Sequence, residues 1–289
     1  MLTIKTFIKR HPVLIYYTLT FTISWSGILT VVGPDGIPGT GKQVDTLVLF
    51  VLLALFAGPS LAGVVLTGLV DGRAGFRRLV SRMTKWRVDA RWYAVAVLSA
   101  PLLLMLILLP LSVLFPEFIP GILTRSDKAT WLLISITSGL IGGGFLEELG
   151  WTGFALPKLR LRYSAFQTGL IMGLLWGVWH LLITLWMSGT SSGVFSLAIF
   201  LPGMLFHIVS LTAYRVLMVW IYDRTGSLLV AMLMHASLSA SRGILNPVRL
   251  SLMSGLTYDL IVAAALWIVV AAGHRKQTLP RQARGALPG

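Results

Sequence analysis

The stretch TLVLFVLLALFAGPSLAGVVLTGLV, residues 46–70, carries no charged residue and decides the fold class. A helix that crosses a lipid bilayer needs about 20 predominantly apolar residues, so this stretch predicts a transmembrane helix. Further runs of this kind lie at residues 13–32, 92–115, 130–156, 164–187, 193–214 (extending toward Trp220), 227–245 and 251–272. We therefore predict an all-α, polytopic membrane helix bundle of about eight transmembrane helices.

The composition points to the same class. Hydrophobic residues make up 56% of the 289 residues, and the mean hydropathy is +0.83, which excludes a soluble globular protein. Cysteine is absent, which excludes a disulfide framework, a thiol nucleophile and a thiolate metal site. We expect residues 1–289 to form a single integral domain of the cell membrane, with its catalytic core at about 130–245.

The net charge of +14 is gathered in short segments between the apolar runs. The positive-inside rule places most of the lysines and arginines, and with them both termini, in the cytoplasm. The apolar run that follows the basic start is too long for the core of a signal peptide, so residues 13–32 are expected to remain as the first span. Anionic lipid headgroups account for the positive charge, and no nucleic-acid partner is expected.

Residues 71–91, DGRAGFRRLVSRMTKWRVDAR, form the most basic of these segments. Phe76, Leu79, Val80 and Met83 recur at helical intervals among the arginines. This pattern is typical of an amphipathic helix that lies in the headgroup plane. The alternative is a solvated basic loop.

Ionisable side chains inside the spans mark the functional region, because a charge in the bilayer costs at least about 2.5 kcal/mol and is usually functional. Two adjacent acids, Glu147 and Glu148, lie in the fourth span, and His180 and His235 lie in the fifth and seventh. At about 1.5 Å of rise per residue, Glu147 and His235 reach a similar depth. His180 is expected to lie deeper than both.

A buried carboxylate beside imidazoles can hydrolyse a carbonyl group by two routes. The glutamate can take a proton from water while His or Ser donors stabilise the oxyanion. Alternatively, Glu147, His180 and His235 can bind a metal ion such as zinc, whose open position holds the water. Ser239 shares a helix face with His235, and the glycines at 142–144 leave room for a substrate or for close helix packing. The spacing leaves both routes open.

Three motifs resemble those of the CAAX-protease and bacteriocin-processing (CPBP) family of intramembrane proteases, which includes the type II CAAX prenyl endopeptidases. They are EELGWTGFALPKL at 147–159, WGVWHL at 176–181 and RTGSLLVAMLMHASLSA at 224–240. The segment WRVDARWY at 86–93 is also similar, so that the resemblance covers roughly half of the chain. It implies that Glu147 activates the water with help from His180, that His235 holds the oxyanion and that Glu148 orients the site. Family members are described both as metalloproteases and as metal-free glutamate proteases, so the resemblance leaves zinc open.

Two positions depart from the family pattern. Thr152 stands where the family has an arginine, so Glu148 loses its expected partner one turn away, and Arg215 is the candidate replacement. Ser239 stands where the family has an asparagine and offers a hydroxyl of shorter reach.

Our leading hypothesis is an intramembrane endopeptidase that cuts a peptide or protein segment presented at the membrane. The two departures motivate an alternative, a catalytically silent member that binds a peptide or acts as an immunity or scaffold protein. A proton-coupled transporter, which also uses Glu and His in its spans, ranks last. His207 is expected to hydrogen-bond between helices, and Asp259 to lie near the outer interface.

Overall fold

The computed structural model describes residues 4–33, 35–248 and 250–278. Eight segments within these residues are helical, long and apolar enough to cross a membrane, and the described part of the chain contains no strand beyond an isolated bridge between Gly189 and Phe195. The predicted all-α, multi-pass membrane fold is therefore confirmed. The eight segments are Pro12–Val32, Gly41–Met83, Ala90–Leu114, Lys128–Leu159, Ala165–Met187, Leu197–Thr225, Leu228–Leu245 and Leu252–His274.

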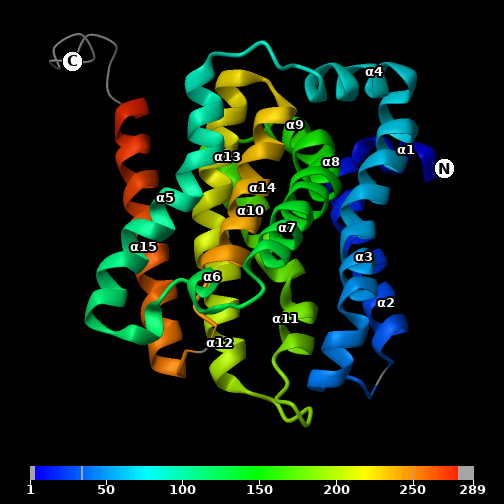
Figure 1. Ribbon diagram of the computed structural model, residues 1–289. Coiled ribbons are helices and arrows are strands. Elements are labelled where there is room, and N and C mark those ends of the chain that lie inside the picture. Colours follow the sequence, from blue (N-terminus) through cyan, green and yellow to red (C-terminus); the bar gives the residue numbers. More distant parts are fainter. Residues whose placement is uncertain (1–3, 34, 249, 279–289) are drawn as a thin grey trace, which may run out of the picture.

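Figure 1 shows how the helices run up and down the bundle. In chain order the elements are α1 (Ile4–Arg10), α2 (Pro12–Val32), α3 (Gly41–Leu66), the π-helix η1 (Thr67–Asp71), α4 (Gly72–Met83), α5 (Ala90–Leu114), the 3-10 turn η2 (Pro116–Phe118), α6 (Gly121–Thr124), α7 (Lys128–Ser138), the π-helix η3 (Gly139–Glu147), α8 (Glu148–Gly150), the π-helix η4 (Trp151–Ala155), α9 (Leu156–Leu159), α10 (Ala165–Trp179), α11 (Leu181–Met187), α12 (Leu197–Leu205), the π-helix η5 (Phe206–Ser210), α13 (Leu211–Thr225), α14 (Leu228–Leu245) and α15 (Leu252–Thr278).

The sixth span differs from its predicted range of 193–214, which was expected to extend toward Trp220. Its helix begins only at Leu197, because the preceding residues form a loop in which the amide of Ser196 bonds to the carbonyl of Ser188. It continues to Thr225 and ends at Gly226, whose left-handed backbone (φ 58°) closes the helix. The fifth span also breaks into two helices at His180. Apolar composition alone did not reveal either feature.

Both described ends of the chain lie at the same end of the bundle, together with α4 (Figure 1). An even number of crossings requires this arrangement. The placement of this end in the cytoplasm remains a prediction from the charge distribution.

The basic segment forms the helix α4 over Gly72–Met83, which lies across the end of the bundle (Figure 1). Leu79 is buried, whereas Phe76 and Val80 are exposed. This two-faced helix suits the predicted position in the headgroup plane.

Glycines allow two helices, α10 and α13, to pack closely against each other. A stripe of glycines at 169, 173 and 177 faces the later part of the sixth span, and Cβ atoms at Gly169 and Gly173 would lie only 2.6 and 2.5 Å from the Cα atoms of Val216 and Thr212. Small residues at every fourth position are typical of tightly packed membrane helices. The backbones of α10 and α13 therefore approach closely and carry Trp176 and Arg215 to the same place.

Candidate active site

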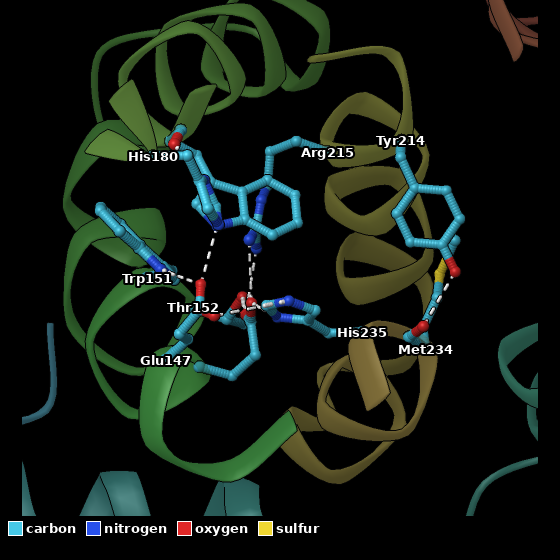
Figure 2. Close-up of polar contacts among 10 residues, drawn as sticks. Glu147, Trp151, Thr152, His180, Tyr214, Arg215, Met234 and His235 are labelled. Carbon is cyan, nitrogen blue, oxygen red and sulfur yellow. Dashed lines mark hydrogen bonds and ion pairs between the residues drawn. The ribbon is translucent and has the colours of Figure 1, made fainter. Parts of the chain in front are cut away.

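Glu147 and Glu148 lie where the fourth span leaves regular α-helical geometry. The π-helix η3 ends at Glu147, and the π-helix η4 begins three residues after Glu148. π-Helical turns are rare and frequently occur at functional sites. The side chain of Glu147 points into the bundle (Figure 2), and both glutamates are almost fully buried, with Glu147 3% and Glu148 0% exposed.

Glu148 connects three spans. Its Oε1 accepts a hydrogen bond from Nη2 of Arg215 at 2.9 Å, and its Oε2 accepts one from Nη1 at 3.1 Å. Oε1 also lies 2.8 Å from Nδ1 of His235 on α14, and the hydroxyl of Thr152 donates to Oε2. Since a carboxylate paired with arginine accepts but does not donate, Nδ1 of His235 carries a proton. The other ring nitrogen of His235, Nε2, faces Glu147 (Figure 2).

Arg215 supplies the positive charge that Thr152 cannot. The guanidinium is completely buried, forms the two-pronged pair with Glu148, and lies over the ring of Trp176 with 4.2 Å between the guanidinium carbon and the ring centroid. The sequence-based suggestion that Arg215 replaces the missing partner of Glu148 is confirmed. A buried carboxylate requires such a partner because it has lost its hydration.

Two indole groups hold Glu147, and the sequence analysis missed both. Nε1 of Trp151 donates to Oε2 at 3.1 Å, and Nε1 of Trp176 donates to the same oxygen at 2.8 Å. Trp151 follows Glu147 by one helical turn, and Trp176 is the aromatic residue one turn before His180. The spacing of one turn was the available signal. With Oε2 fixed in this way, Oε1 is the atom left to act on a substrate or a water.

His180 lies at the break between α10 and α11, where it follows the last residue of α10. Its Nδ1 lies 2.9 Å from the carbonyl oxygen of Trp176. A carbonyl only accepts, so Nδ1 donates and Nε2 keeps its lone pair. Because Trp176 reaches Glu147 and lies one turn from His180, the greater expected depth of His180 does not keep it from the site.

Glu147 and His180 line a cavity of about 250 Å³. Its polar lining consists of Ser138, Glu147, His180, Thr184, His207 and Ser239, and its apolar lining includes Leu52, Leu55, Phe56, Ile183 and Met187. Beside it, Nε2 of His235 lies 3.9 Å from Oε1 of Glu147. That separation is too long for a direct hydrogen bond and can be bridged by one water molecule.

The glycines at 142–144 serve both purposes that the sequence allowed. A Cβ at Gly143 would lie 2.5 Å from Oγ of Ser239 and 2.9 Å from Nε2 of His235, so this position leaves space for the site itself. A Cβ at Gly144 would lie 2.9 Å from the carbonyl oxygen of Met232, so this position allows η3 to pack against α14. Ser239 therefore lines the site beside His235, as its spacing predicted.

The ring nitrogens of the two histidines suit a metal ion, but the arrangement of the side chains does not. Imidazoles whose Nδ1 is held by a second partner are typical zinc ligands, and Nδ1 of both His180 and His235 has such a partner. Among the described residues, however, no three His, Asp or Glu side chains gather closely enough to hold a metal ion. Glu147, His180 and His235 therefore do not form a ligand set here, and we derive no step through a metal.

His207 lines the same cavity as Glu147 but, like Asp259, forms no hydrogen bond with either glutamate. The ring of His207 stacks on that of His180 with 4.3 Å between centroids, and its Nδ1 lies 3.0 Å from Oγ1 of Thr184. The expected interhelical hydrogen bond of His207 is confirmed. Asp259 is buried and accepts a hydrogen bond from Nη1 of Arg242 at 3.0 Å, which links α14 to α15.

Comparison with known proteins points to the same region. Residues 129–241 match the family model of the type II CAAX prenyl endopeptidase, Rce1-like. The CAAX prenyl protease 2 of Methanococcus maripaludis is 47% identical over 34 residues, which make up 12% of this chain and 12% of that protein. The chain therefore matches only a small part of the length of this relative. The matched range contains Thr152, Arg215 and His235, the hydrogen-bond partners of Glu148.

Proposed function

We propose that this membrane protein is an intramembrane endopeptidase, because residues 129–241 match the model of the Rce1-like type II CAAX prenyl endopeptidases. It hydrolyses a peptide bond of a membrane-associated substrate with a water molecule that Glu147 activates. The observation that carries the proposal is the convergence of Glu147, His180 and His235, from three different spans, on one buried polar cluster. Lipid-facing acids and imidazoles would have no such role.

Glu147 is the general base. Its Oε2 is fixed by two indole N–H groups, so Oε1 takes the proton from the water. The water oxygen then forms a bond to the carbonyl carbon of the substrate. The peptide C–N bond breaks, and the proton passes from Glu147 to the leaving amine nitrogen.

His235 and its partners stabilise the negative charge that develops on the carbonyl oxygen. Glu148 accepts a hydrogen bond from Nδ1 of His235 and holds the ring so that Nε2 faces Glu147, where an Nε2–H group donates to the oxyanion. Arg215 and Thr152 keep Glu148 ionised and in place. His180, with its free Nε2 on the cavity wall, assists in positioning the water, and the hydroxyl of Ser239 adds a second donor.

The substrate class follows from the family. The relative is named a CAAX prenyl protease, so peptides with a prenylated cysteine near the C-terminus are the first substrates to try. The apolar side of the cavity, which includes Leu52, Leu55 and Phe56, is compatible with a lipid-bearing peptide. An unmodified peptide presented at the membrane is the second choice.

The decisive experiment measures cleavage by purified protein in proteoliposomes, with fluorogenic peptides offered in farnesylated and unmodified form. We expect Glu147→Gln to lower the rate by about 10²–10⁴-fold, the usual contribution of a general base. Glu117→Gln, at an exposed position within η2 whose carboxylate contacts only Ser254 among the described residues, is the matched control and should keep full activity. Full activity of Glu147→Gln would refute the mechanism.

The same preparation distinguishes the remaining alternatives. A silent family member would cleave none of the peptides although the protein is folded, and its biological effect would survive Glu147→Gln. Metal analysis and a chelator titration of the active protein test for zinc. A proteolytic activity that disappears with the chelator and returns with zinc would overturn the metal-free route.

A further inference from the structure

A second, larger cavity of about 620 Å³ lies at the end of the bundle that holds both described chain ends. It is enclosed by η1, α4, η4, α9 and the last turns of α13, and it shares no lining residue with the catalytic cavity. Its charged lining is strongly basic and consists of Asp71, Arg77, Arg78, Arg82 and Lys158.

Some of these charges already have structural roles. Arg82 donates to the hydroxyl of Tyr222 at 2.8 Å and to the carbonyl oxygen of Gly153 at 2.7 Å, which holds α4 against the bundle. Lys158 lies 2.7 Å from the carboxylate of Asp71. These contacts form the floor of the cavity and neutralise its only acidic lining residue among the described ones.

Two guanidinium groups at the mouth are not used in this way. Arg77 forms no hydrogen bond or ion pair with any residue that the structure describes. Arg78 approaches Asp71 only to 3.7 Å, and its side chain is 62% exposed. Arg78 shares the single carboxylate of Asp71 with Lys158, and Arg77 has no ion-pair partner among the described residues, so the positive charge of this lining exceeds its negative charge.

We propose that this cavity binds the phosphate group of an anionic ligand, with Arg77 and Arg78 as its principal contacts and Lys158 below them. Planar guanidinium groups match the oxygens of a phosphate in pairs. The exposed Phe76 and Val80 place α4 at the level of the lipid headgroups, where such phosphates are abundant. The volume lies in the range of small-molecule sites and exceeds what one free phosphate fills.

The test removes the positive charges of Arg77 and Arg78. Purified protein is titrated with phosphatidylglycerol, with phosphatidylcholine and with glycerol 3-phosphate, and binding is measured by native mass spectrometry. We compare Arg77→Gln/Arg78→Gln with Arg73→Gln/Arg87→Gln, a control that removes the same charge from the same segment outside the cavity lining. All four positions are exposed, so the variants should fold.

We expect the cavity variant to bind phosphatidylglycerol about tenfold more weakly than the native chain, because it loses charge-assisted hydrogen bonds to the phosphate, which are worth at least about tenfold in affinity. The control should bind it within about twofold, because Arg73 and Arg87 lie outside the cavity lining. Binding of glycerol 3-phosphate with the same dependence on Arg77 and Arg78 would extend the ligand class to soluble phosphates, and both results support the site. Equal weakening in the two variants, or no weakening in the cavity variant, would overturn the proposal. Because the readout is binding, it does not depend on whether the protein is a protease.

Discussion

At the scale of single residues, Glu148 has three partners, Arg215, His235 and Thr152, and Arg215 supplies the positive charge that balances its carboxylate. The guanidinium contacts Glu148 through two nitrogens and also covers Trp176, which in turn donates to Glu147. One side chain thus supports both glutamates. An arginine at position 152, one helical turn after Glu148, would reach only Glu148.

We predict that Arg215→Met destabilises the protein by about 3–5 kcal/mol, because it leaves a buried carboxylate without its counter-charge. Activity should fall with it. The double variant Thr152→Arg/Arg215→Met returns a guanidinium to Glu148 from within its own helix and into the volume that Arg215 vacates. It should recover most of the thermal stability and part of the activity, as measured by thermal shift and peptide cleavage. An Arg215→Met variant with unchanged stability would contradict the pairing.

At the scale of elements, the π-helix η3 and the helix α14 meet through adjacent glycines with different neighbours. The missing side chain of Gly143 faces Ser239 and His235, whereas that of Gly144 faces the backbone of α14. Because His235 is held by Glu148, an added methyl group at 143 displaces a ring that cannot move freely.

Gly143→Ala is therefore expected to lower peptide cleavage by at least about tenfold with a small change in melting temperature, since misplacement of a catalytic group by about 1 Å can cost about 10²-fold. Gly144→Ala is expected to destabilise the fold by about 1–3 kcal/mol through overpacking. The pair serves as its own control. Equal effects of the two changes on stability would show that Gly143 is only a packing residue.

At the scale of the whole molecule, the eight crossings place the described chain ends and α4 together at one end of the bundle (Figure 1). The loop between α11 and α12 lies at the opposite end. The absence of cysteine makes the orientation easy to measure, because any introduced cysteine is the only one.

We predict that Val194→Cys, in the loop at the far end, reacts with a membrane-impermeant maleimide in intact cells, because the positive-inside rule places it outside. Leu161→Cys, in the loop after α9, should react only after the membrane is permeabilised. Both side chains are well exposed, at 63% and 83%, so a failure to react reports location. Labelling of Leu161→Cys in intact cells would reverse the predicted orientation.

The sequence by itself determined the number of spans, favoured a helix over residues 72–83, and named the acids and imidazoles of the candidate site. These features depend on local composition and on the 3.6-residue period, which each segment carries independently of its neighbours. The position of Ser239 on the same helix face as His235 also follows from this period, because Ser239 lies one turn after His235.

Only the tertiary structure decided how the spans meet. The indole donors to Glu147, the arrival of Arg215 from the sixth span and the level of His180 depend on how closely α10, α13 and α14 approach. That approach is set by which glycine opposes which backbone atom, and by π-helical turns that rotate the following residues. Such contacts join residues far apart in the chain, and hydropathy and spacing within one helix contain no information about them.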